Sequence, residues 1–197
     1  MSGTRRFVIG ISGASGAILG LRCLEMLREI SGIESHLVVT PAAERTLSFE
    51  IDRQAHARAL ALADVTHRCN DVGAAIASGS FRCQGMVVAP CSMRTLSAIA
   101  YGLSDNLLTR AADVTLKERR RLVLVARETP LHAGHIEAML KVTGLGAIVL
   151  PPVPAFYTRP GSLDEVVSQI AAHALELAGL DMSHALVRWN GDESGPV

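Results

Sequence analysis

Short, almost wholly apolar segments recur along this chain and alternate with segments of helical periodicity. Strands that are buried on both faces of a parallel sheet show such continuous apolar runs. Strand and helix alternation also favours right-handed crossovers over a parallel sheet. The sequence therefore predicts an α/β fold with a doubly wound parallel sheet, a Rossmann-like or flavodoxin-like three-layer sandwich. The expected strands are Arg6–Ile11, His36–Thr40, Gly85–Ala89, Leu122–Ala126 and Ala147–Leu150.

The expected helices begin at recognisable start signals. Pro41 suits a first helical turn, and Ser162 suits an N-cap position. In open α/β sheets, ligands bind outside the carboxyl ends of the strands. The segments that follow the strands should therefore surround one crevice. The expected helices are 18–30, 41–50, the segment after Ser92 through Ala100, 106–118, 132–142 and 162–178.

Length and charge limit the organisation and the partners. The chain has 197 residues, enough for one sizeable core but few for two. We expect a single domain over residues 1–197, with a C-terminal tail from about residue 181. Lys plus Arg and Asp plus Glu balance at 19 each, so no net field favours nucleic acid or a membrane surface. A small molecule or another subunit is the expected partner.

Neither a membrane span nor an exported protein is indicated. No apolar run approaches the roughly 20 residues that cross a bilayer. The four cysteines lack the paired spacing of a zinc site or redox dithiol, and no secretory leader is recognisable. A cytoplasmic location is therefore expected.

A glycine-rich turn follows the first expected strand. Gly13, Ser15 and Gly16 lie where the strand leads into a helix, so backbone N–H groups and the helix dipole can hold a phosphate. The spacing differs from GxGxxG, which disfavours a dinucleotide. Glycine also serves any tight strand-to-helix turn, and this alternative stays open. The turn predicts a phosphorylated cofactor.

A second such junction follows the expected strand at 85–89. Ser92 and Thr95 flank a helix start, and Arg94 between them suits a phosphate or a ring edge. Two phosphate-binding junctions on one sheet strengthen the prediction of a phosphorylated cofactor.

Charged residues gather near the end of the expected strand 122–126. Arg127 and Glu128 follow it directly, and Lys117 precedes it in a basic run. A functional role competes with a surface ion pair, which is the ordinary explanation for such charges. Glu50, near the end of its helix, suits either a functional carboxylate or a solvated face.

The remaining candidates are aromatic, histidine and cysteine side chains. Phe156 and Tyr157 suit either a rigid aromatic wall of the crevice or a buried loop anchor. The histidines lack HExxH-like spacing, and His132 with His135 fits a helix start, so no metal is expected. Cys91 follows an apolar strand and is expected to be a packed cysteine.

Five segments in order resemble one family across nearly the whole chain. They are GISGASGA, PCSMRTLSAIA, RAADVTLKERR, RETPLH and PPVPAFYTRP, and they resemble the flavin prenyltransferase (UbiX-like) family. The resemblance implies a single flavin-binding domain of flavodoxin-like fold that binds reduced FMN as a substrate and takes a dimethylallyl group from dimethylallyl phosphate. The product, prenylated FMN, would serve a separate prenylated-flavin-dependent decarboxylase. A homo-oligomer, a dodecamer with sites at subunit junctions, is also implied.

The resemblance also implies roles for residues at matching positions. The leaving phosphate requires neutralised charge, and ring closure on the flavin requires a group that takes a proton. Ser15, Glu50 and Glu128 are the implied catalytic residues. The phosphate of the donor would contact Lys117, Arg127, Tyr157 and His173. The flavin would contact Gly13, Ala14, Ser15, Thr40, Ser92, Met93, Arg94, Thr95 and Arg127.

One position departs from the family pattern. His173 stands where the family usually has an arginine that holds the donor phosphate, and histidine is not permanently charged. Phe81 replaces another aromatic residue and would reshape the isoprenyl pocket. Trp189 matches a tail that covers a neighbouring subunit's site.

Two other functions are compatible with this fold class. An FMN-binding carrier without prenyl transfer would agree with His173. A flavin-dependent decarboxylase of peptidyl cysteine would require an active-site histidine, and PCSMRTLSA contains none. The sequence leaves open the downstream acid, the choice of monophosphate or diphosphate donor, and which carboxylate handles the proton.

Overall fold

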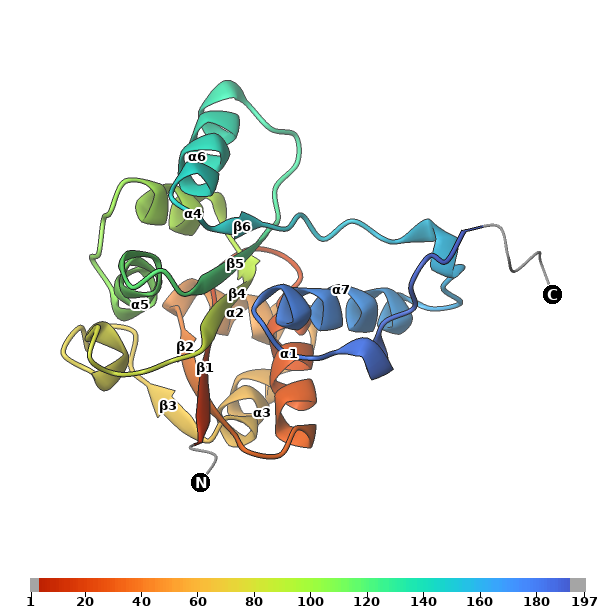
Figure 1. Cartoon of the computed structure of the whole chain (residues 1–197), viewed down its shortest axis with the longest axis horizontal. Helices are drawn as coiled ribbons and strands as arrows, with labels where there is room; N and C mark the ends of the chain where they lie inside the picture. The colour runs from red at the N-terminus through yellow and green to blue at the C-terminus, as the bar shows by residue number, and fades with distance from the viewer. Residues whose placement is uncertain (1–3, 192–197) are drawn as a thin grey trace.

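A six-stranded parallel sheet forms the centre of the molecule (Figure 1). The computed structural model describes residues 4–191, and the six strands lie within that range. The strand order is β3-β2-β1-β4-β5-β6. From β1 the chain first adds strands on one side and then, starting with β4, on the other side, so the topological switch point lies between β1 and β4. Ligands bind at such switch points in open α/β sheets. The strands are β1 Arg5–Ile11, β2 Ile33–Val39, β3 Val65–His67, β4 Gly85–Cys91, β5 Arg121–Ala126 and β6 Ile148–Val149.

Helices cover both faces of the sheet, which confirms the predicted three-layer fold class. Figure 1 shows α1, α3 and α7 on one side and α4, α5 and α6 on the other. The helices are α1 Ile18–Glu29, α2 Pro41–Glu50, α3 Ala55–Leu62, α4 Met93–Ala100, α5 Leu107–Lys117, α6 Ala133–Gly144 and α7 Leu163–Leu177. Short 3₁₀ turns are η1 Ala75–Ala77, η2 Phe156–Thr158 and η3 Ser183–Ala185.

The continuous apolar strands supply two cores. Phe7, Ile9 and Ile11 of β1 pack with the α1 and α7 layer, whereas Val8 packs with the α4 and α5 layer. Successive residues of a strand point to opposite faces. A strand covered on both faces therefore needs apolar residues at every position, as the sequence pattern predicted.

One glycine sets the distance between α1 and the sheet. A Cβ atom at Gly20 would lie 2.3 Å from the carbonyl oxygen of Ala89 in β4. No side chain fits at that separation, so Gly20 allows α1 to pack directly against the backbone of β4.

The sequence analysis missed one strand and one helix. Between residues 51 and 84 it placed no element, but α3 and β3 lie there. β3 has only three residues, at the sheet edge, and its side chains are partly exposed. Such a strand lacks the apolar run that identified the others. β2 also begins at Ile33 rather than His36, and β6 is limited to Ile148–Val149.

The helix start signals were correct. Pro41 is the first residue of α2, and Ser162 is the N-cap of α7, where its side chain accepts a hydrogen bond from the Glu165 N–H.

In the described part of the chain, none of the helices has the length and apolar character that a bilayer crossing requires. The single-domain assignment over 1–197 stays a prediction, because residues 1–3 and 192–197 lie outside the described range.

Candidate functional site

A cleft lies at the carboxyl ends of β1, β2 and β4. We call this cavity of about 690 Å³ the central cleft. It contains Gly13 after β1, Thr40 after β2 and Glu128 after β5. Loops from four strands thus meet around one space, as expected for this fold. The other residues that line it are Pro41, Ala42, Cys69, Asn70, Ser92, Met93, Arg94, Thr95, Asp105 and Asn106.

The N-cap residues of α2 and α4 both line the central cleft. Thr40 caps α2, where its Oγ1 accepts a hydrogen bond from the Ala43 N–H at 3.2 Å. Ser92 caps α4, where its Oγ accepts a hydrogen bond from the Thr95 N–H at 3.3 Å. The positive ends of both helix dipoles therefore face the same space, and such ends favour an anion.

Ser12 fixes the two strand ends at the switch point. Its buried hydroxyl donates a hydrogen bond to the Pro90 carbonyl at 3.0 Å and accepts one from the Ser92 N–H at 2.8 Å. The loop after β1 is thereby joined to the cap of α4. Sequence reasoning missed Ser12, although it directly precedes the glycine-rich turn.

Gly13 is required by a close approach. A Cβ atom at this position would lie 2.4 Å from the Cβ of Ala42 in α2. The glycine therefore lets the loop after β1 lie against the first turn of α2, where both Gly13 and Ala42 line the central cleft.

Arg94 lies at the mouth of the central cleft in an ion pair. Its Nη2 lies 2.5 Å from an Asp105 carboxylate oxygen, and both side chains are more than half exposed. Asn106 donates from its side-chain amide to the other oxygen of Asp105 at 2.9 Å. Sequence reasoning missed Asp105 and Asn106, which carry no motif signal apart from the N-cap position of Asn106.

A second cleft, here called the arm cleft, brings Ser15, Glu50 and Arg127 together. This cavity of about 520 Å³ is closed on one side by Pro152 and Pro154. Glu50 Oε2 accepts hydrogen bonds from the Gly16 and Ala17 N–H groups, both at 2.9 Å. A carboxylate thus already occupies the amino end of α1. The phosphate-binding role predicted for this loop therefore depends on its earlier residues, Gly13 to Ser15.

The surroundings keep Glu50 ionised. Partial burial raises the pKa of Glu50. Hydrogen bonding by the Ser15 side chain and by the Ala17 and Gly16 amides, together with the charge of Arg127, lowers it by more, so the pKa of Glu50 lies below its ordinary value. An ionised carboxylate at neutral pH is able to accept a proton.

Arg127 and Glu128 diverge after β5. Arg127 lines the arm cleft, whereas Glu128 lines the central cleft. This follows from the alternation of side chains along an extended segment. Glu128 accepts a hydrogen bond from the Thr129 N–H at 3.0 Å. The two candidate carboxylates, Glu50 and Glu128, therefore lie in different clefts.

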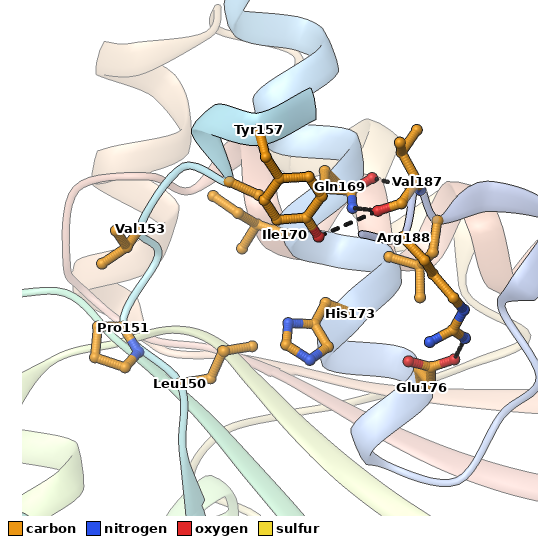
Figure 2. Close-up of a pocket in the computed structure, with 12 residues that line it drawn as sticks. Leu150, Pro151, Val153, Tyr157, Gln169, Ile170, His173, Glu176, Val187 and Arg188 are labelled. Atoms are coloured by element: carbon orange, nitrogen blue, oxygen red, sulfur yellow. Dashed lines mark hydrogen bonds and ion pairs between the residues drawn. The ribbon is translucent and has the colours of Figure 1, made fainter. Parts of the chain in front are cut away.

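Tyr157 and His173 lie in a third cavity of about 440 Å³, here called the tail cleft (Figure 2). The extended segment 150–155 separates it from the arm cleft, because Pro151 and Val153 line the tail cleft and the alternating prolines line the arm cleft. Ile170 of α7 lines both. The two clefts are thus neighbours, and within one chain His173 does not share a cleft with Arg127.

Lys117 lies away from all three clefts. It ends α5, just before the amino end of β5, whereas Arg127 follows the carboxyl end of that strand. The six residues of β5 separate these ends by about 20 Å. Lys117 forms an ion pair with Glu118. A single chain does not bring Lys117 to the other candidates.

Three other side chains considered in the sequence analysis lie outside the three clefts: Phe156, Phe81 and Cys91. Phe156 is 77% exposed, so the buried-anchor alternative is wrong for it. Phe81 lies outside the three clefts, beside His36 and under the Arg6 guanidinium. Cys91 is buried in the core, and burial raises the pKa of its thiol.

Among the described residues, histidines and carboxylates do not gather into a metal site. The rings of His132 and His135 lie with their centroids 3.6 Å apart and their planes tilted by 31° at the start of α6. Within residues 4–191, no group of three or more histidine, cysteine, aspartate or glutamate side chains is arranged to hold a metal ion.

Known proteins resemble this chain over almost its full length. The Flavoprotein family matches residues 1–174. Flavin prenyltransferase UbiX of Escherichia coli strain K12 is 52% identical over 188 residues, which cover 95% of this chain and 99% of the relative. The crystal structure of AnUbiX (PadA1) in complex with FMN and dimethylallyl pyrophosphate is 49% identical, with a TM-score of 0.90 over 95% of this chain and 98% of that one. A dodecameric FMN-dependent Ubix-like decarboxylase from Escherichia coli O157:H7 is 44% identical, with a TM-score of 0.90 over 94% of this chain and 100% of that one.

Proposed function

Since this chain belongs to the flavin prenyltransferase family, we propose that it transfers a dimethylallyl group from dimethylallyl phosphate to reduced FMN. The product, prenylated FMN, would then serve a partner decarboxylase. The observation that carries this proposal is the convergence of Ser15, Glu50 and Arg127 beside a cleft that receives two helix amino ends.

The central cleft is the proposed FMN site. The amino ends of α2 and α4 favour the phosphate, and a volume of about 690 Å³ falls in the range of small-molecule sites. Thr40 and Ser92 would fix the phosphate end, and Arg127 would approach the flavin from the neighbouring arm cleft. The full proposed set remains Gly13, Ala14, Ser15, Thr40, Ser92, Met93, Arg94, Thr95 and Arg127.

The charged groups have complementary proposed roles. The allylic C–O bond of the donor breaks while the C5 unit becomes bonded to the flavin, and negative charge grows on the departing phosphate. Arg127 would stabilise that charge. Glu50, ionised and oriented by the Gly16 and Ala17 amides, would accept the proton released on ring closure. Ser15, which lines the same cleft and helps to lower the pKa of Glu50, would orient Glu50. Glu128 is the second candidate for the proton.

Lys117 has a role only if another subunit supplies it. We propose a homo-oligomer, on the pattern of the dodecameric relative, in which the Lys117 end of α5 reaches a neighbouring chain's clefts. Tyr157 and His173 would hold the donor phosphate from the tail side, next to Arg127 of a neighbouring chain, because segment 150–155 separates them from Arg127 within one chain. A cytoplasmic location remains part of this proposal.

The test is anaerobic incubation of the purified protein with reduced FMN and dimethylallyl phosphate, followed by mass measurement of the extracted flavin. We expect the mass to increase by one C5 unit. Glu50→Gln should retain FMN but react about 100-fold more slowly. Glu44→Gln, on the same helix and outside the arm cleft, is the control and should react like the wild type.

Flavin that stays bound and unmodified with both dimethylallyl phosphate and the diphosphate would contradict the transferase. That outcome would support an FMN carrier instead.

A further inference from the structure

One face of α7 and the chain's tail lie side by side and line the tail cleft. Gln169, His173 and Glu176 are spaced four and three residues apart, so they share one helix face, and all three line the cleft. Figure 2 shows the tail residues Val187 and Arg188 lying along that face, with Tyr157 above His173.

Three hydrogen bonds hold the tail in this position. Gln169 donates from Nε2 to the Val187 carbonyl at 2.9 Å, and its Oε1 accepts from the Val187 N–H at 3.2 Å. The Tyr157 hydroxyl also donates to the Val187 carbonyl, at 3.2 Å. Fixing Val187 in this way places the next residue, Arg188, beside the cleft-facing side of α7.

Arg188 is the one permanently charged cation among the described residues that line the tail cleft. Its guanidinium forms an ion pair with Glu176 (Figure 2), with side-chain exposures of 54% and 27%. An ion pair exposed to this degree contributes little to folding. His173 is the other basic group there, and a histidine side chain is not permanently charged.

We propose that Arg188 binds the phosphate of the prenyl donor and that Glu176 is a counter-ion which this phosphate displaces. The proposal rests on the function proposed above. A guanidinium matches the geometry of a phosphate monoester, which it can bind through two parallel N–H donors. Arg188 would thus supply, from the tail, the fixed positive charge that His173 does not supply from α7. Tyr157 and His173 contribute further hydrogen-bond donors.

The two partners of the ion pair should then affect donor binding in opposite directions. Arg188→Gln should raise the KM for dimethylallyl phosphate about tenfold or more, because a hydrogen bond to a charged group is lost. Glu176→Gln should lower that KM by about threefold, because Arg188 is no longer neutralised and a carboxylate no longer repels the phosphate. The KM for FMN should stay unchanged in both. Arg188→Lys, which keeps a point charge, should give an intermediate value.

If the ion pair between Arg188 and Glu176 only tethered the tail, the donor KM would respond differently. Both variants would then weaken donor binding together, and that result would overturn the proposal. An unchanged donor KM in Arg188→Gln, with normal product formation, would overturn it as well while leaving the proposed function intact. Arg58→Gln and Asp52→Asn, which break a comparably exposed ion pair away from the tail cleft, are the controls.

Donor binding can also be measured without turnover. If the wild type forms no prenylated flavin, the proposed function fails, and calorimetric titration with dimethylallyl phosphate then tests Arg188 by itself. The same opposite changes in affinity support the proposal, and parallel changes contradict it. If Arg188→Gln does not fold, Arg188→Lys and Glu176→Gln supply the comparison.

Discussion

At the scale of single residues, Glu50 shows how one side chain is prepared for two tasks. Its carboxylate accepts two N–H groups at the amino end of α1, where the helix dipole favours negative charge. The same contacts stabilise the fold and keep the carboxylate ionised beside Arg127. A group in this position is both a cap for the helix and a base for the proposed reaction.

Glu50 should therefore make stability depend on pH. Because its pKa in the folded protein is lowered, its contribution is fully present above the ordinary pKa of about 4.3 and is lost as pH falls through the lower, folded pKa. Glu50→Gln should reduce the free energy of unfolding at pH 7, and the difference from wild type should shrink toward zero below about pH 4. Urea denaturation across this range measures it.

Glu29→Gln, at the exposed carboxyl end of α1, is the control and should change little at either pH. An equal loss for Glu50→Gln at pH 7 and at about pH 3 would contradict the electrostatic explanation.

At the scale of elements, the packing of α1 against β4 depends on the absence of one side chain. Alanine normally stabilises a helix relative to glycine by about 1 kcal/mol. At Gly20 the new Cβ would meet the Ala89 carbonyl oxygen at 2.3 Å, so α1 would have to move away from the sheet. We expect Gly20→Ala to lower the free energy of unfolding by about 1–3 kcal/mol.

A matched glycine is available in α6. A Cβ atom added at Gly144 would have no other atom within 4 Å, so Gly144→Ala should be neutral or stabilising by up to about 1 kcal/mol. Chemical denaturation of both variants gives the comparison. A stabilising Gly20→Ala would show that α1 is not held against β4 as described.

The sequence predicted those elements that carry a strong local signal. β1, β4 and β5 are buried on both faces, and their continuous apolar runs identified them. β3 was missed because an edge strand of three partly exposed residues has no such run. For the candidate site, strand-end logic identified Ser15, Arg127 and Glu128, whereas the role of Glu50 was implied only by the family resemblance. This logic could not assign Arg127 and Glu128 to different clefts. That division depends on which way consecutive side chains point after β5.

Ser12 and Arg188 were missed for a related reason. Ser12 acts through tertiary hydrogen bonds to Pro90 and Ser92, which are distant in sequence. Arg188 reaches α7 only because the tail folds back and Gln169 holds Val187. Contacts between distant segments leave no periodic pattern in the sequence.

At the scale of the whole molecule, three neighbouring clefts lie on the side of the sheet where the strands have their carboxyl ends. The central cleft offers two helix amino ends, the arm cleft offers Arg127 with Glu50, and the tail cleft offers Tyr157 with Arg188. Lys117 lies near the amino end of β5, on the opposite side, so its proposed role requires a second subunit. We therefore expect a complete site to be a property of the assembly.

A crystal structure of the protein grown with FMN and dimethylallyl phosphate tests this arrangement most directly. We predict that FMN lies in the central cleft between Gly13, Thr40 and the cap of α4, and that Lys117 of a neighbouring subunit approaches Arg127. FMN bound in the tail cleft, or a complete site formed without any neighbouring chain, would contradict the arrangement.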